Sequence, residues 1–403
     1  MKTPKEWRSV RLRYLCKINP MARRLVGPIA FAPMDAVGTL GGIRFDHTLE
    51  EADVSAGLSY FEEGDVIVAK ITPCFENGKC ALAENVPDGR ALGSTEFHVI
   101  RPGSEILPRF LFYAVASAAF RQSGEAQMYG AAGQKRVPTD FIKDFCLRFP
   151  DRGSQRAVAA SLDLQTSRID ALMAKKQRMI ELLDEKRNAL ISRAITQGLD
   201  PSVPMKVSGV PWLGPVPKHW AVKRLARFCF LQRGQDLPDQ ERENGEVPIL
   251  SSAGISGRHI RAAAYGPAVV TGRYGSIGRV FYVDGPFWPL NTTLYSVSLF
   301  GNDARYVKFM LEHLPLASDS EKSAVPGVNR NYLHTLEVAC PPIDEQAQIA
   351  AICLSIEATF RDLSGAVQTA IDRLREYRSA LITAAVTGQL DLREHEKKME
   401  ALA

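Results

Sequence analysis

The chain has 403 residues, of which 45% are hydrophobic and 24% are charged. This composition is typical of a globular protein with two or more domains and excludes a collagen-like or wholly disordered chain. The 50 basic and 45 acidic residues give a net charge of +5, which alone does not indicate a nucleic-acid-binding protein. With no long apolar run and no secretory signal, we expect a cytoplasmic protein without membrane contact. The seven cysteines and seven histidines lack disulfide-framework or metal-ligand spacing.

Residues 1–150 predict a first domain of mixed structure. Short β-branched or aromatic runs bounded by turn-forming residues, at 64–70 and 95–103, predict strands. A helical pattern follows over 107–124. We therefore expect an α+β domain with a helix late in it.

Residues 151–200 predict one long helix. Apolar residues recur at steps of three, four or seven, with charged residues between them. A narrow apolar stripe sustained over about 35 to 40 residues is typical of a helix that pairs in a coiled coil. The residues of this stripe are Leu162, Ile169, Leu172, Met179, Leu183, Leu190 and Ala194.

In the second half of the chain, the sequence predicts the same order of elements as in the first half, a mixed domain followed by a long helix. Residues 201–217 are rich in proline and glycine and predict a connector. Residues 218–341 predict a second α+β domain, residues 342–391 a second long helix, and residues 392–403 a charged tail. Strands are expected at 265–275, 278–285 and 291–300, and a helix at 303–315.

The two long helical segments are copies of one another. The segment that ends at Asp200 matches the segment that ends at Asp391 without a gap, so that Gln155 corresponds to Gln346 and Arg187 to Arg378. The first copy is net basic and the second net acidic, which favours their pairing. We predict an α+β fold in which two α/β domains are separated by two long helices that form an antiparallel coiled coil, with an internal pseudo-twofold repeat. The alternative is that each helix packs only against its own domain.

Because the sequence lacks several known catalytic motifs, we predict that the chain is not an enzyme. It lacks an F-x-G-x-G cofactor loop, an acidic or amide residue ahead of Pro-Pro-aromatic, and a phosphate-binding G-x-x-x-x-G-K-[ST] loop. Pro238, Asp239 and Glu241 resemble part of a nuclease motif, but no lysine follows in the required place. We therefore expect no cofactor and no metal site.

Polar, basic loops with glycines occur at corresponding places in the two halves. Loops 69–86 and 271–283 each follow a predicted strand, and loops 130–141 and 324–333 each precede the repeated segment. Basic, amide and hydroxyl side chains in such loops can donate to phosphates and read base edges, although each one taken alone could equally be a solvated loop residue. The candidate DNA-binding residues are Lys70, Thr72, Asn77, Lys79, Gln134, Lys135, Arg136, Arg273, Tyr274, Ser276, Arg279, Asn329 and Arg330.

Four sequence features together resemble the specificity subunit of a type I restriction-modification system, over nearly the whole chain. They are the duplicated Pro-Lys-x-Trp segments, Pro-x-x-x-x-Gln at the start of each long helix, the helix endings RNALISRAITQGLD and RSALITAAVTGQLD, and RYGSIGR followed by WPLNTTLY. One departure is that Gln155 lacks the preceding acidic residue that Gln346 has.

The resemblance implies that residues 1–150 and 218–341 are target-recognition domains, each reading half of a bipartite, asymmetric site on double-stranded DNA. It implies that the helices form the spacer between them. It also implies two modification (methyltransferase) subunits, which bring S-adenosylmethionine, and restriction subunits, which bring ATP-driven translocation and cleavage. The chain itself would then hold no cofactor.

Two other functions stay open on the residues alone. The chain could be a self-sufficient DNA-modifying enzyme with an unrecognised active site, or a purely structural coiled-coil scaffold. The scaffold does not explain two domains with matched basic loops.

Overall fold

A computed structural model describes residues 7–21, 27–39, 41–51, 54–55, 57–131, 133–273, 278–315 and 329–390. The chain forms two compact units, unit 1 being Met1–Gln177 with Thr369–Ala403 and unit 2 being Arg178–Gln368. Each long helix therefore contributes one part to each unit. Among the described residues, none of the helices is long and apolar enough to cross a membrane.

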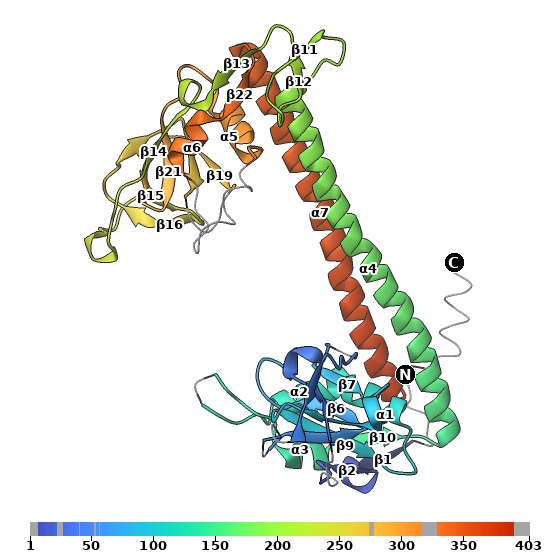
Figure 1. The fold of residues 1–403 in the computed structure, drawn as a ribbon. Coiled ribbons are helices and arrows are strands. Elements are labelled where there is room, and N and C mark those ends of the chain that lie inside the picture. Colours follow the sequence, from blue (N-terminus) through green and yellow to red (C-terminus); the bar gives the residue numbers. More distant parts are fainter. Residues whose placement is uncertain are drawn as a thin grey trace. The chain divides into compact units, whose positions relative to one another are not determined.

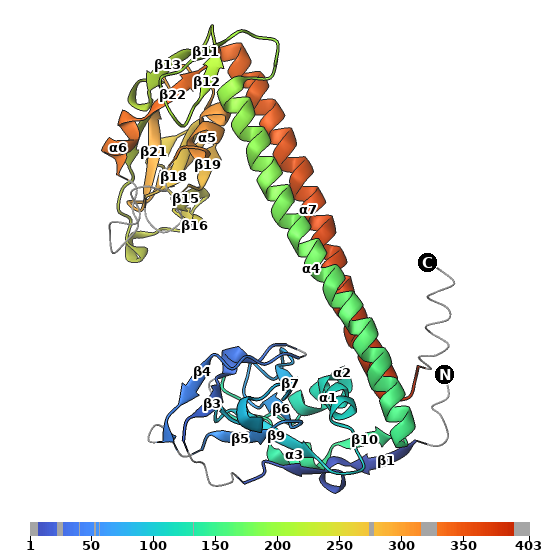
Figure 2. The same cartoon turned by 45° about the vertical axis from the view of Figure 1, so that its right-hand side comes forward.

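Unit 1 contains two four-stranded sheets, of order β2-β9-β6-β7 and β4-β3-β8-β5, and the pair β1-β10 (Figures 1 and 2). Its elements are β1 (Arg8–Arg11), η1 (Leu12–Tyr14), β2 (Cys16–Ile18), β3 (Ile29–Ala32), η2 (Met34–Ala36), β4 (His47–Leu49), β5 (Ser59–Glu62), β6 (Val66–Ala69), β7 (Cys80–Leu82), η4 (Pro87–Gly89), β8 (Arg90–Gly93), β9 (Phe97–Pro102), α1 (Pro108–Ala116), α2 (Ala118–Glu125), α3 (Thr139–Asp144) and β10 (Cys146–Phe149).

Unit 2 also contains two four-stranded sheets, of order β14-β21-β18-β19 and β16-β15-β20-β17, with the pair β13-β22. Its elements are β11 (Met205–Val207), β12 (Pro215–Pro217), β13 (Ala221–Arg224), η5 (Leu225–Arg227), β14 (Phe230–Arg233), η6 (Asp239–Glu241), β15 (Val247–Ser251), β16 (Gly254–His259), β17 (Ala264–Tyr265), β18 (Ala268–Gly272), β19 (Val280–Val283), β20 (Pro286–Pro289), β21 (Thr293–Ser298), α5 (Ala304–Glu312), α6 (Arg330–Thr335) and β22 (Glu337–Cys340).

The two units share one topology. Each strand order of unit 1 has its counterpart in unit 2, and each unit contains a single parallel pairing among its named strands, β3 with β8 and β15 with β20. The predicted internal repeat and the predicted α+β fold are therefore confirmed. The predicted connector contains one small hairpin, in which β11 pairs with β12.

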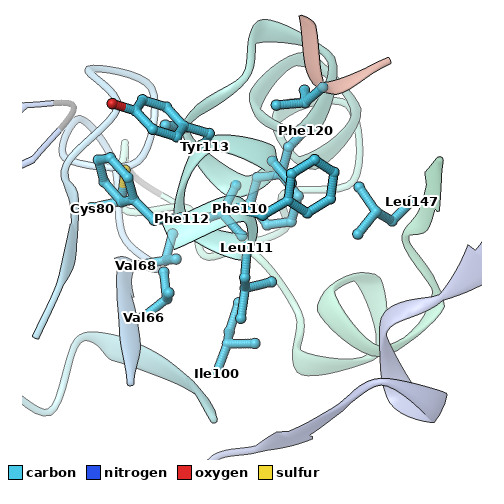
Figure 3. Close-up of a cluster of buried hydrophobic side chains, with 14 of the residues drawn as sticks. Val66, Val68, Cys80, Ile100, Phe110, Leu111, Phe112, Tyr113, Phe120 and Leu147 are labelled. Carbon is cyan, nitrogen blue, oxygen red and sulfur yellow. The ribbon is translucent and has the colours of Figure 1, made fainter. Parts of the chain in front are cut away.

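The central strand β6 explains how the core of unit 1 is layered. All four of its residues are buried. Val66 and Val68 face the cluster formed around α1, as Figure 3 shows, whereas Ile67 and Ala69 belong to the cluster on the other side of the sheet. A strand buried on both faces reads as a continuous apolar run, which is why the sequence predicts it clearly.

One predicted helix is divided in the structure. The pattern over 107–124 forms α1 and α2, with Ser117 between them in an extended conformation. The Ser117 hydroxyl accepts a hydrogen bond from the Phe120 amide at 3.3 Å and donates one to the Ala114 carbonyl at 2.7 Å. Serine favours such capping positions, so the chain begins a new helix here.

The two long helices, α4 (Arg152–Gln197) and α7 (Ile343–Val386), run antiparallel to one another (Figures 1 and 2). In unit 1, Leu162 of α4 shares a buried cluster with Leu381 of α7. In unit 2, Ala194 shares one with Ile349. The helices therefore pair with each other, as predicted.

The predicted apolar stripe is wrong at three positions on α4. Leu172, Met179 and Leu190 are 43%, 48% and 37% exposed. The less exposed positions instead recur at alternating steps of four and three, which keeps one face toward the partner helix. This face includes polar residues such as Lys176, so following apolar character alone selected neighbouring positions.

A buried glutamine near the start of each long helix attaches that end of the helix to the surrounding unit. Gln155 accepts a hydrogen bond from the Leu107 amide at 2.8 Å and donates to the carbonyls of Glu105 and Pro150 at 3.1 and 3.0 Å. Gln346 accepts from the Asp303 amide at 3.0 Å, and donates to the Asn302 side chain at 2.8 Å and the Pro341 carbonyl at 2.9 Å. These contacts explain the duplicated Pro-x-x-x-x-Gln motif.

Candidate nucleic-acid interface

In unit 1, the connection between β6 and β7 begins and ends with a basic residue. Lys70 follows the last paired residue of β6, and Lys79 directly precedes β7. The Lys70 amide donates to the carbonyl of Glu96 at 2.9 Å, and the Ala69 amide donates to the carbonyl of Lys79 at 3.0 Å. The hairpin therefore holds the Lys70 backbone beside the start of β9 and the Lys79 backbone on the opposite edge of β6.

In unit 2, Arg273 and Arg279 take the same two positions. The Arg273 amide donates to the carbonyl of Thr292, the residue directly before β21, at 2.8 Å. Arg279 directly precedes β19, whose partner β18 is the counterpart of β6. The structure thus places Arg273 at the equivalent of Lys70 and Arg279 at the equivalent of Lys79.

Three of these basic side chains, those of Lys79, Lys70 and Arg279, differ in their surroundings. Lys79 Nζ donates to the carbonyl of Met34 at 2.8 Å. Burial lowers the pKa of Lys70; the carboxylate of Glu96 opposes this shift, and the charge of Arg136 adds to it. The Arg279 guanidinium is exposed and lies 5.6 Å from the ring centroid of Phe281.

The second candidate loop of unit 1 is bound directly to this hairpin. The Thr72 hydroxyl donates to the carbonyl of Gly133 at 2.7 Å and accepts from the Lys135 amide at 3.1 Å. The Thr72 amide donates to the carbonyl of Lys135 at 3.0 Å, and the Val137 amide donates to the carbonyl of Lys70 at 2.8 Å. Two loops that the sequence predicted separately therefore form one surface.

A carboxylate that the sequence analysis missed lies in this surface. The Arg136 guanidinium donates from Nε to both oxygens of Glu96, at 3.1 and 3.0 Å, and from Nη2 to one of them at 2.8 Å. The hydrogen bond from Arg136 lowers the pKa of Glu96. Glu96 and Arg136 are 40 residues apart, so no local pattern in the sequence predicted that they form an ion pair.

The remaining candidate residues are distributed over both units. Asn77 and Gln134 are exposed. Asn329 caps α6, where its side chain accepts from the Asn331 amide at 2.9 Å, and Arg330 begins that helix. Tyr274 and Ser276 lie outside the described residues, as do residues 324–328 of the predicted loop 324–333.

No group of three or more His, Cys, Asp or Glu side chains within the described ranges could hold a metal ion. All seven cysteines are free thiols, and burial raises the pKa of Cys16, Cys229, Cys340 and Cys353 to about 12, which suppresses thiolate formation.

Comparison with known proteins gives a family match in the second half. Residues 217–371 match the family described as "Type I restriction modification DNA specificity domain". Over 189 residues, 45% of this chain and 31% of that protein, the chain is 36% identical to the type I restriction enzyme EcoAI specificity subunit of Escherichia coli. Over 162 residues, 39% of this chain and 27% of that protein, it is 33% identical to the EcoEI specificity subunit of the same species. These matches span about a third or less of the relatives' length.

Solved structures show the same fold along nearly the whole chain. A chain from a study of complex assembly and conformational transition of the type I R-M system superposes with a TM-score of 0.78 at 19% identity, covering 97% of this chain and 100% of that one. The HsdS subunit from Thermoanaerobacter tengcongensis gives a TM-score of 0.54 at 18% identity, covering 97% of this chain and 99% of that one.

The chain has the fold of two repeated α+β units with paired long helices. Residues 217–371 are similar to the type I restriction modification DNA specificity domain. The predicted resemblance to type I specificity subunits is thereby confirmed.

Proposed function

We propose that the chain is the sequence-specific DNA-binding subunit of a type I restriction-modification complex. Each unit reads one half of a bipartite, asymmetric site on double-stranded DNA. The observation that carries this proposal is the equivalence of the Lys70–Lys79 and Arg273–Arg279 positions in the two repeated units.

Basic residues at equivalent positions of the two units are suited to binding two similar stretches of double-stranded DNA. Cations at both ends of a hairpin connection can neutralise phosphates and so fix the orientation of each unit on DNA. The residue types differ, however, because lysine is a compact point charge whereas arginine offers a planar fork of donors. Arginine can pair with two acceptors of a guanine, so the two units are suited to different half-sequences.

The proposed complex supplies the chemistry that this chain does not. Two modification subunits bring S-adenosylmethionine and methylate the DNA, and restriction subunits bring ATP-driven translocation and cleavage. The chain positions both on the site in the cytoplasm and acts without catalytic residues or cofactors of its own. The names of its relatives, specificity subunits of type I restriction enzymes, support this role.

The experiment is methylome sequencing of cells with and without the gene. We expect one bipartite methylated motif to disappear when the gene is deleted and to return when it is restored. Unchanged methylation at every motif would contradict the proposal. Transfer of labelled methyl groups from S-adenosylmethionine to DNA by the isolated chain would instead support a self-sufficient enzyme, and DNA binding without sequence preference would support a scaffold.

A further inference from the structure

We propose that Arg136 contacts a guanine in the half-site of unit 1, and that Glu96 is the positioning residue that presents its guanidinium. The proposal rests on the proposed DNA-reading function and deepens it.

The geometry of the Glu96–Arg136 pair leaves the Nη1–Nη2 edge of the guanidinium available to a base. Glu96 receives Nε and one hydrogen of Nη2, so it occupies one side of the planar group. Nη1 makes no hydrogen bond to any described residue, and Arg136 retains 44% exposure of its side chain. The edge formed by Nη1 and Nη2 is the edge that can donate in parallel to O6 and N7 of guanine.

Both ends of Arg136 are held in place. Its amide donates to the carbonyl of Tyr129 at 2.8 Å, and its own carbonyl accepts from the Tyr129 amide at 3.2 Å. A bridge with Ile71 joins it to the hairpin connection. Reading a base requires a side chain whose rotamers are restricted before DNA arrives, because ordering it on binding costs affinity. Backbone pairing at one end and the Glu96 carboxylate at the other provide that restriction.

The surrounding charge favours an anionic partner over a purely internal ion pair. Lys70 and Arg136 interact with the carboxylate of Glu96, and Lys135 directly precedes Arg136. The exposed Glu76 adds a second carboxylate to the hairpin connection. An exposed ion pair contributes little to folding stability. The excess of cations over carboxylates is therefore better matched to DNA phosphates around a base contact than to a role in stability.

Unit 2 differs at this position. Thr292 precedes β21 as Glu96 precedes β9, so the counterpart of Glu96 carries no carboxylate. The described residues of unit 2 thus lack this positioning pair at the equivalent place, which is the kind of difference that lets two repeated units read different half-sequences.

The test selects binding sites for the full-length chain from a fully randomised duplex library, followed by sequencing. The variants are Arg136→Lys, which keeps the charge but loses the planar fork, and Glu96→Gln, which keeps the shape but weakens the support. The matched control is Glu84→Gln, because Glu84 accepts two hydrogen bonds from Arg109, at 2.7 and 2.9 Å, and lies after β7, whereas the hairpin connection lies before β7.

We expect the wild type to select a guanine at one position of the unit 1 half-site. In Arg136→Lys this preference should fall on the order of 5- to 150-fold, with an unchanged salt dependence of binding. In Glu96→Gln the same position should lose part of its preference, while the other half-site and the unfolding temperature stay as in the wild type. Glu84→Gln should select the wild-type sequence.

Three outcomes would overturn the inference. The first is a bipartite wild-type preference that neither Arg136→Lys nor Glu96→Gln changes. The second is a loss of affinity for all sequences alike, which would identify a phosphate contact. The third is a lower unfolding temperature in Glu96→Gln with unaltered preferences, which would identify a structural pair. A wild-type chain that selects no bipartite sequence would instead refute the proposed function itself.

Discussion

Arg378 of α7 donates hydrogen bonds from Nε and Nη2 to the two carboxylate oxygens of Asp170 of α4, at 2.9 and 3.1 Å. The internal repeat places Arg187 and Arg361 at the equivalent positions of unit 2, so an opposite-charge pair in one unit corresponds to two arginines in the other. Arg187 pairs with Asp184 of its own helix at 3.1 Å. The seam between the helices is therefore repeated in its positions but not in its charges.

We predict that Asp170→Asn lowers the free energy of unfolding by about 1 kcal/mol, because Arg378 is nearly buried while Asp170 is half exposed and partly screened. Urea unfolding followed by circular dichroism measures the change. Glu181→Gln is the control, since its pair with Arg178 is exposed on both sides. An equal effect of both substitutions would show that the ion pair of Arg378 with Asp170 adds no more to the free energy of unfolding than an exposed ion pair does.

We predict that Arg361→Asp stabilises the chain by about 0.5 to 1 kcal/mol, because it places a carboxylate at the unit 2 equivalent of Asp170. Arg361→Asn serves as the comparison, as it removes the positive charge without adding a negative one. The gain should shrink at high salt, where surface charges are screened. If the two variants unfold at the same urea concentration, a carboxylate at position 361 does not interact with the guanidinium of Arg187.

We predict that Gln155→Ala and Gln346→Ala each cost about 1 to 3 kcal/mol in the free energy of unfolding. Each glutamine is at most 2% exposed, and its loss leaves backbone groups buried without partners. Gln177→Ala, on the exposed face of α4, is the control and should change little. A cost for only one of the two glutamines would mean that the duplicated motif is not used equally by the units.

We predict that Arg273→Ala weakens recognition of the unit 2 half-site and leaves that of unit 1 intact. A base-reading arginine is worth about 1 to 3 kcal/mol of discrimination. Footprinting on a site found by methylome sequencing measures each half separately, with Lys70→Ala as the reciprocal variant. Equal weakening of both halves by either substitution would argue that these residues act on overall affinity.

We predict that the stability of unit 1 decreases as the pH falls from 6.5 toward 4, in part through His98. Burial lowers the pKa of His98 to about 4, so the folded state holds the ring neutral while the unfolded state binds a proton below pH 6.5. This loss of stability is absent above pH 6.5 and grows to at most about 3 kcal/mol in the free energy of unfolding by pH 4. His98→Gln should flatten this part of the pH profile in urea unfolding. An unchanged slope would place the pH dependence on other groups.

Local signals in the sequence were sufficient for the duplication, the two long helices and most of the strands near the candidate interface. A helix of 46 residues and a strand buried on both faces each leave a periodic or continuous apolar pattern along the chain. The same local signals located the hairpin loops that carry Lys70 and Arg273. The sequence also indicated that these loops correspond, but the residue-by-residue match of Lys70 with Arg273 stayed hidden, because the halves differ by insertions and only the strand register aligns the two residues.

The tertiary structure decided which side chains meet. Met173 and Lys176 lie on the less exposed face of α4 while the neighbouring Leu172 is exposed, because a residue's position in the average 3.5-residue repeat decides whether it faces the partner helix. Glu96 reaches Arg136 because β9 starts beside the hairpin connection and the second loop pairs with it. Such contacts depend on strand order and on loops that return to the same edge of a sheet, so composition and spacing along the chain carry no record of them.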